Sequence, residues 1–296
     1  MNYKQLSFLD FDSDSHKIPP PFKTQLLKWI GNKQRFAHEI IRYFPQQYGT
    51  YYEPFMGSGA VLGTLAPTSA VASDALQPLI ALWQTLKAAP DEIKLRYAER
   101  WEKCALGDKK LEYEKIKAAY NAHPNWADLL FLSRSCYGGV VRFRKDGYMS
   151  TPCGIHDPIS PESFNRRVDE WHNRVSGTKF VHSGFEQIMD EAQTGDMIYC
   201  DPPYTHTQSI LYGAQSFSLD RLFETIQRCK ERGIFVLLSI DGTKKTGKKE
   251  LFLPIPNGLF EREAFVNCGR SMLRRFQMEG ESLESEIVTD RLLLTY

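Results

Sequence analysis

Several features that would mark a membrane, exported or zinc-binding protein are missing from this chain of 296 residues. It has no run of about 18 apolar residues, so no membrane-spanning helix is expected. Its N-terminal stretch lacks the apolar core of a signal peptide, so we expect a cytoplasmic protein. None of the six cysteines forms a C-x-x-C pair, which favours reduced thiols and gives no reason to expect a metal site.

A large excess of charge of one sign is missing as well. The net charge is only +1, so binding to nucleic acid would require positive charge that is clustered locally. The hydrophobic fraction of 42% and the charged fraction of 25% are those of an ordinary globular protein. A chain of this length can bury a substantial core, as one large domain or as one domain with an insertion.

Short runs rich in Val, Ile, Tyr and Phe predict seven strands. Helical patterns separate the first five, which predicts parallel strands joined by helices. The last two have no clear helix between them and are compatible with an antiparallel pair. The expected fold class is therefore α/β, with a doubly wound, mostly parallel sheet. The predicted strands are 50–55, 70–73, 179–183, 196–200, 233–240, 259–266 and 287–296.

Between the second and third predicted strands the pattern becomes helical. One helix is expected to open at Pro90 and another to span 109–122. A third should follow Ser160, because Ser is a good N-cap, Pro161 suits the first turn and Glu162 complements the helix dipole. We therefore expect a flexible N-terminal arm over 1–24, an α/β domain formed by 25–82 and 178–296, and a helical insertion over 83–177.

A hairpin is predicted inside this insertion, over residues 140–151. Asp146-Gly147 stands between two β-prone runs, which is a strong local signal for a hairpin. Arg142, Arg144 and Lys145 give this hairpin a basic edge. Two interpretations stay open from these residues alone: a solvated hairpin, or an arm that enters a nucleic-acid groove.

The first motif with chemical meaning is EPFMGSG, residues 53–59, in which a strand leads through a glycine-rich turn into a helix. Gly57 and Gly59 let the backbone turn sharply and approach a ligand closely. The next strand ends at Asp74, which could accept hydrogen bonds from a ribose or merely cap the following helix. Leu62 occupies the place of a third glycine, so the motif indicates a nucleoside cofactor without requiring a pyrophosphate.

The second motif is Asp201-Pro202-Pro203-Tyr204, directly after a predicted strand. The amine of adenine is a poor nucleophile because its lone pair is delocalised into the ring. A carboxylate from Asp201 and the carbonyl of Pro202 could accept its two N–H bonds and free that lone pair. The prolines remove two backbone donors, and Tyr204 offers an aromatic face for an extruded base. The alternative is a proline-rich turn in which Asp201 is a local cap.

Together these residues resemble the Dam-like (D12 class) family of adenine-N6 DNA methyltransferases, in the order of its α group. Four blocks carry the resemblance: 27–33, 53–59 with Asp74, 136–154 and 200–204. The resemblance implies a Rossmann-like methyltransferase sheet and a target-recognition insertion. It also implies site-specific transfer of a methyl group from S-adenosylmethionine to a flipped adenine in double-stranded DNA. It leaves open whether a cognate restriction endonuclease exists, and no stable complex with one is required.

The resemblance assigns roles residue by residue. Catalysis falls to Asp201, Pro202, Pro203 and Tyr204. Cofactor binding falls to Trp29, Lys33, Glu53, Phe55, Gly57, Gly59, Asp74, Phe185 and Asp201. Contacts to DNA fall to Lys28, Tyr137, Val140, Arg142, Arg144, Lys145 and Pro152. On a helical pattern, however, Trp29 is also compatible with a core position and Lys33 with a solvated charge.

Two positions depart from the family pattern. The family often has an acid before an aromatic residue after the fourth strand, whereas this chain has Gly184 before Phe185. In the recognition block, Gly138 replaces an asparagine, so the family's commonest target sequence is not assumed. Alternatives to be tested are an inactive DNA-binding relative and methylation of another amine, in cytosine N4 or in RNA adenine.

Overall fold

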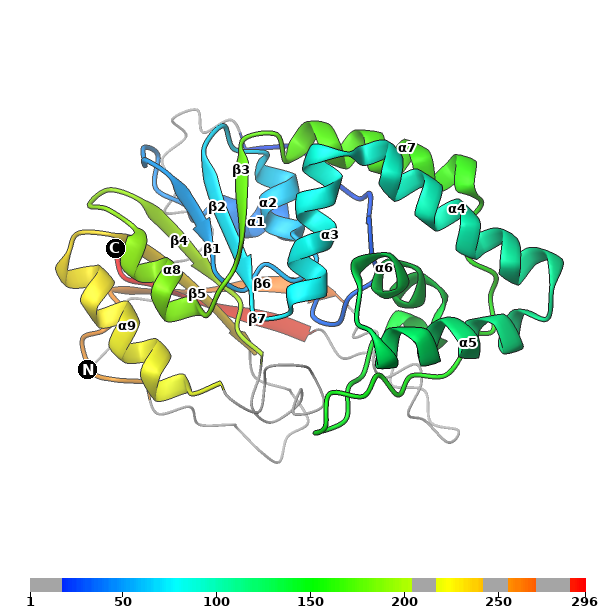
Figure 1. Ribbon diagram of the computed structural model, residues 1–296. Helices are drawn as coiled ribbons and strands as arrows, with labels where there is room; N and C mark the ends of the chain where they lie inside the picture. Colours follow the sequence, from blue (N-terminus) through cyan, green and yellow to red (C-terminus); the bar gives the residue numbers. More distant parts are fainter. Residues whose placement is uncertain (1–17, 204–216, 242–254, 270–287) are drawn as a thin grey trace.

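The structure is a computed structural model that describes residues 18–203, 217–241, 255–269 and 288–296. These residues form one seven-stranded sheet with helices packed on it (Figure 1). The strand order is β3-β2-β1-β4-β5-β7-β6. The strands are β1 (Tyr51–Glu53), β2 (Ala70–Asp74), β3 (Thr178–His182), β4 (Met197–Cys200), β5 (Phe235–Asp241), β6 (Arg262–Gly269) and β7 (Val288–Leu294).

The directions of the strands confirm the predicted α/β fold. Strands β1 to β5 run parallel, whereas β7 pairs antiparallel with both β5 and β6. The order reverses between β1 and β4, which pair with Tyr51 opposite Met197. Ligands of doubly wound sheets bind at such a reversal, beyond the carboxyl ends of the strands. The loops that follow β1 and β4, which carry the two motifs, therefore leave the sheet side by side.

The start of β6 differs from the prediction. The strand was expected from residue 259, but it begins at Arg262. Leu259 and Phe260 are buried, yet Leu259 lies in a turn: Gly258 has φ +77°, and the Leu259 N–H donates to the Pro256 carbonyl at 3.3 Å. The predicted start of β6 was wrong because buried apolar residues of a turn cannot be told from strand residues by their composition.

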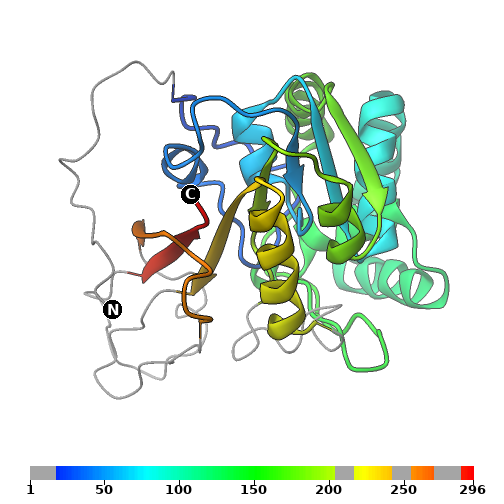
Figure 2. The same cartoon turned by 90° about the vertical axis from the view of Figure 1, so that its left-hand side faces the viewer.

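Side chains of the central strands alternate between two buried faces. Tyr51 and Tyr199 belong to one apolar cluster, whereas Tyr52, Ile198 and Cys200 belong to the other. Helices α8 (Phe185–Glu191) and α9 (Leu219–Glu231) lie beside each other over the second face (Figures 1 and 2). The first face is covered by α1 (Ala37–Ile41), α2 (Ala60–Leu65) and α3 (Gln77–Ala88).

The segment between β2 and β3 continues from α3 into further helices, on the right in Figure 1. The predicted starts at Pro90 and after Ser160 and the predicted span 109–122 are confirmed, and the Ser160 hydroxyl accepts the Ser163 N–H. The elements are α4 (Pro90–Leu106), α5 (Lys109–Ala122), α6 (Trp126–Ser135), the 3₁₀ helix η1 (Tyr137–Gly139) and α7 (Pro161–Arg174).

Two contacts tie α7 to the rest of the molecule. Trp171 lies so close to Gly63 of α2 that a Cβ on this glycine would come within 2.4 Å of the indole ring. Phe22 is buried between Trp171, with ring centroids 5.1 Å apart, and the Arg174 guanidinium at 3.9 Å. Phe22, within the stretch expected to be a flexible arm, is therefore packed against α7. Among the described helices, none is both long and apolar enough to cross a membrane.

Candidate active site

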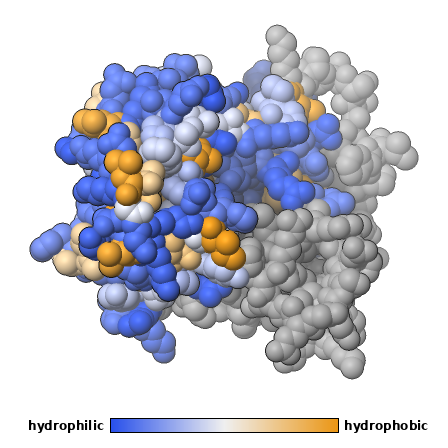
Figure 3. All heavy atoms as spheres, turned by 90° about the vertical axis from the view of Figure 1, so that its right-hand side faces the viewer, coloured by the Kyte–Doolittle hydropathy of each residue, from blue (hydrophilic) through white to orange (hydrophobic). Residues whose placement is uncertain are grey.

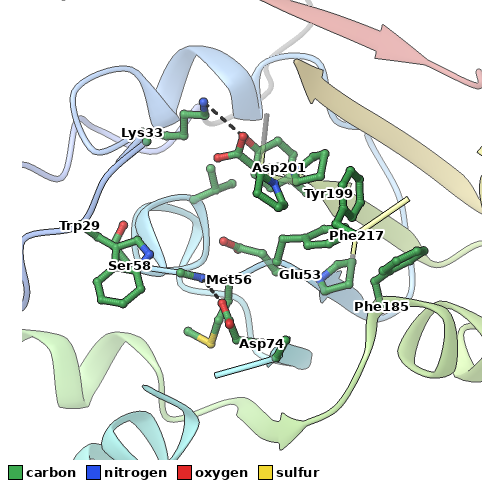
Figure 4. Close-up of a pocket in the computed structure, with 18 of the residues that line it drawn as sticks. Trp29, Lys33, Glu53, Met56, Ser58, Asp74, Phe185, Tyr199, Asp201 and Phe217 are labelled. Carbon is green, nitrogen blue, oxygen red and sulfur yellow. Dashed lines mark hydrogen bonds and ion pairs between the residues drawn. The ribbon is translucent and has the colours of Figure 1, made fainter. Parts of the chain in front are cut away.

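A cavity of about 330 Å³ opens at the carboxyl edge of the sheet, where the loops after β1 and β4 meet (Figure 4). It brings together ten of the predicted site residues from five parts of the chain. These lining residues are Trp29, Lys33, Glu53, Phe55, Gly57, Asp74, Phe185, Asp201, Pro202 and Pro203. Gly59 supports the same turn without lining the cavity, and Tyr204 lies outside the described residues.

The glycine turn is held between two tryptophans. Gly57 and Gly59 have φ values of +47° and +63°, in the left-handed region that favours glycine. A Cβ at Gly57 would lie 3.2 Å from Trp29, and one at Gly59 would lie 3.3 Å from Trp83. The Trp83 indole N–H also donates to the Gly57 carbonyl at 3.3 Å. The turn thus needs glycine for its backbone angles and for its close neighbours.

Asp74 serves the turn and the next helix together. One carboxylate oxygen accepts the Gly57 N–H at 3.0 Å, and the other accepts the Leu76 N–H at 3.0 Å at the start of α3. The capping interpretation of Asp74 therefore describes a real contact. A carboxylate oxygen can accept more than one hydrogen bond, and Asp74 lines the cavity. Capping does not prevent it from contacting a ligand.

At the opposite end of the cavity, Lys33 forms a buried ion pair with the second motif. Its ammonium lies 3.2 Å from Asp201 Oδ1 and 2.8 Å from Asp290 Oδ2. Only 6% of the Lys33 side chain is exposed, so the interpretation of Lys33 as a solvated helix charge is wrong. Asp290, which stands beside Arg291 in β7, was not among the predicted site residues.

Glu53 lies between these two ends of the cavity in Figure 4. It is buried and accepts the Tyr51 hydroxyl at 2.7 Å. Burial raises the pKa of this carboxyl to about 8; the Tyr51 hydrogen bond opposes the shift, and the nearby Asp201 adds to it. Glu53 is therefore mainly neutral at pH 7, and a cation bound in the cavity would favour its ionised form.

An aromatic wall closes the side of the cavity nearest α8. Phe55 and Phe185 stack with centroids 5.2 Å apart, and Phe217 lies 5.9 Å from each of them. At the end of this wall, Glu186 forms an ion pair with Arg221. Phe217 and Arg221 were not among the predicted site residues; they stand before and within α9 and reach the cavity only through tertiary packing.

The predicted hairpin has cross-strand backbone bonds. Arg144 N–H donates to the Tyr148 carbonyl and Ser150 N–H to the Arg142 carbonyl, both at 2.9 Å. Gly147, at φ +82°, makes the turn. Pairing is limited to isolated bridges, and the side chains of Phe143 and Met149 are buried. The basic side chains of Arg142, Arg144 and Lys145 are exposed.

The other predicted DNA contacts gather at the base of this hairpin. Lys28 packs against Gly139 so closely that a Cβ there would come within 2.6 Å of its stem. Tyr137 is 40% exposed, and its N–H donates to the carbonyl of the exposed Pro152 at 2.8 Å. Val140 follows η1 directly and is half-buried. These residues lie outside the cavity lining.

The surface on the helical side is mostly hydrophilic, with apolar residues scattered over it (Figure 3). Of the described residues, no group of three or more His, Cys, Asp or Glu could hold a metal ion. Cys200, next to the second motif, is fully buried, and burial raises the pKa of its thiol well above the ordinary value. The site therefore presents carboxylates, backbone carbonyls and aromatic faces as its reactive surroundings.

The family profile described as D12 class N6 adenine-specific DNA methyltransferase matches residues 29–265. The chain belongs to this family. The matched range includes the glycine turn, the hairpin and the Asp201 loop, so the resemblance inferred from the motifs is confirmed. The protein is a DNA methyltransferase specific for the N6 position of adenine, and it therefore uses a methyl donor.

Three curated relatives are matched along most of their length. The chain is 27% identical to the "Type II methyltransferase M1.LlaDCHI" of Lactococcus lactis subsp. cremoris over 72% of this chain and 79% of that protein. It is 28% identical to a "DNA adenine methylase" of Vibrio cholerae, over 74% of this chain and 82% of the relative. A "DNA adenine methylase" of Escherichia coli is 26% identical, with 74% and 81% covered.

Proposed function

We propose that S-adenosylmethionine is the methyl donor and that it binds in the cavity between the Gly57 turn and Asp201. The volume of about 330 Å³ lies within the usual range for small-molecule sites. The charged lining residues are four acids and two bases, which suits a cationic ligand. These residues are Glu53, Asp74, Glu186, Asp201, Lys33 and Arg221. When bound, S-adenosylmethionine supplies a methyl group on positively charged sulfur.

The lining residues divide the cofactor among them. Phe55 and Phe185 offer a flat apolar wall for an adenine ring. Asp74 is placed to accept hydrogen bonds from ribose hydroxyls, and Trp29 offers an aromatic face to a cation. Glu53 is buried in the lining of the cavity, where its ionised form would pair with the positive charge of the cofactor. Gly57 lets the backbone approach the ligand closely, and Gly59 holds the same turn against Trp83.

The target amine is held by Asp201 and Pro202. The Asp201 carboxylate and the Pro202 carbonyl accept its two N–H bonds, which frees the nitrogen lone pair for attack on the methyl carbon. The Lys33 ion pair favours ionised Asp201, which is then purely an acceptor. The observation that carries this proposal is that the Asp201 loop and the glycine turn line one cavity. Tyr204, outside the described residues, is assigned to stack on the base.

The segment 83–177 is proposed as the target-recognition domain, and 25–82 with 178–296 as the catalytic domain. Arg142, exposed on the hairpin, is assigned to read a guanine edge in the major groove. Arg144 and Lys145 contact phosphates, and the residues at the hairpin base flank the flipped adenine's strand. The residues of that base are Lys28, Tyr137, Val140 and Pro152.

Transfer of labelled methyl groups from S-adenosylmethionine tests this function. Duplex DNA, single-stranded RNA and carrier protein are offered separately, and labelled nucleosides are separated after digestion. We expect label in duplex DNA, as N6-methyladenine. Label in N4-methylcytosine, RNA or protein instead would overturn the proposal, and so would binding of duplex DNA without transfer at any concentration of cofactor.

A further inference from the structure

Asp290 of β7 is a buried acid that does not line the cavity but touches its key ion pair. Its Oδ2 atom lies 2.8 Å from the Lys33 ammonium, closer than the 3.2 Å between that ammonium and Asp201. The Ser239 hydroxyl of β5 lies 3.4 Å from the same oxygen. About 6% of the Asp290 side chain is exposed, compared with 18% for Asp201. Of the two carboxylates in this trio, Asp201 is therefore the one that faces the cavity.

In this cluster, the carboxylates of Asp201 and Asp290 both lie next to the ammonium of Lys33. A buried lysine readily loses its charge, and two neighbouring carboxylates oppose that loss. A lysine side chain also has four rotatable bonds, so a fixed ammonium requires an anchor. Asp290 provides this anchor from a strand buried in the sheet, with Leu292 and Leu294 of the same strand in the core.

The division of charge matters for the proposed chemistry. Lys33 paired with Asp201 alone would neutralise that carboxylate and weaken it as an acceptor. With Asp290 as the nearer counter-ion, the trio keeps a formal charge of −1, from two carboxylates and one ammonium. Of the two carboxylates, Asp201 is the one that lines the cavity, where the amine must be polarised in the transition state.

We propose that Asp290 is a positioning residue for methyl transfer, which holds the Lys33 ammonium so that Asp201 shares this cation and remains a strong, fixed acceptor. This inference rests on the role proposed for Asp201. It predicts an effect on the chemical step and little effect on binding, because Asp290 touches neither the cavity nor the hairpin.

The test compares Asp290→Asn, which keeps the size and removes the charge, with Asp290→Glu, which keeps the charge. We expect Asp290→Asn to lower kcat by roughly tenfold to a hundredfold, while KM for duplex DNA and for S-adenosylmethionine stays within about threefold. Asp290→Glu should recover most of the lost rate. Equal losses in both variants, or a kcat within about twofold of wild type for Asp290→Asn, would overturn the inference.

A matched control separates positioning from stability. Asp128 is a buried acid of α6 that pairs with Arg100 at 2.7 Å and does not line the cavity. Asp128→Asn should lower the melting temperature and leave kcat unchanged below that temperature. Asp201→Ala is measured alongside. If it is inactive while Asp290→Asn is normal, only this inference fails; if it still transfers methyl groups, the proposed function fails.

Discussion

The cavity and the hairpin hold their charged residues in opposite ways. Around the cavity, Lys33 and Asp201 belong to a buried cluster, and the Gly57 turn is wedged against Trp29. On the hairpin, Arg142 and Arg144 are exposed on a segment paired only by isolated bridges. In the proposed function, methyl transfer therefore depends on side chains that are fixed by packing. Recognition of the DNA sequence depends on exposed side chains that can adapt to the DNA.

The largest effect should come from the fixed side of this comparison. Asp201→Ala removes the acceptor that polarises the amine, so the single-turnover rate should fall by about a thousandfold or more. Binding of duplex DNA should survive, because the exposed hairpin is untouched. Labelled transfer and a gel-shift titration measure the two quantities. Lost DNA binding with retained turnover would reverse the roles assigned to the two regions.

The glycine turn should be the next most sensitive feature. Gly57→Ala adds a Cβ at 3.2 Å from Trp29 and strains a backbone with φ +47°. Affinity for S-adenosylmethionine, measured by calorimetry, should fall by about tenfold or more, because the turn and Trp29, which both line the cavity, must shift to make room for the Cβ; the left-handed strain of about 1–2 kcal/mol adds a loss of stability.

Gly195→Ala is its matched control. This glycine also has a positive φ, +85°, but a Cβ there would meet no atom within 4 Å. It should lose stability and keep its cofactor affinity. Equal loss of affinity in the two variants would show that backbone strain in general, and not the fit of the turn, controls binding.

On the exposed hairpin, Arg142→Ala should change the sequence preference of methylation more than the overall rate of methylation. Loss of a bidentate contact to guanine should reduce discrimination at one base position by about 1–3 kcal/mol. Methylation-sensitive sequencing of a randomised library measures this directly. A uniform loss over all sequences would instead make Arg142 a phosphate contact.

A smaller effect concerns the pH dependence set by Glu53. Its pKa of about 8 in the folded protein lies above the ordinary value of 4.5, so the folded state binds more protons between these values. This group therefore makes the protein less stable as pH rises through that window. A cationic cofactor favours ionised Glu53, so its affinity should rise as pH approaches and passes 8.

Glu53→Gln should flatten both trends, in thermal unfolding and in cofactor titrations between about pH 5 and pH 9. The cofactor's own ionisation is common to both proteins and cancels in the comparison. Unchanged slopes in the variant would mean that another group titrates in the cavity.

The sequence was enough to predict the motifs that are contiguous in the chain, but not the contacts that form only through tertiary packing. The glycine turn and the Asp201 loop are contiguous motifs after strands, and the alternation of apolar runs and helices was enough to predict the sheet. Lys33 and Asp290 meet only because the C-terminal strand β7 enters the sheet between β5 and β6. Phe217 likewise reaches Phe55 and Phe185 only through tertiary packing.

In the function proposed above, one cavity holds the methyl donor at the glycine turn and the target amine at Asp201. A crystal structure with S-adenosylhomocysteine and duplex DNA tests it most directly. We predict an extruded adenine whose N6 atom lies within about 3.2 Å of the Asp201 carboxylate and of the Pro202 carbonyl. An adenine bound away from Asp201, or a cofactor bound outside the cavity beside Gly57, would contradict the account.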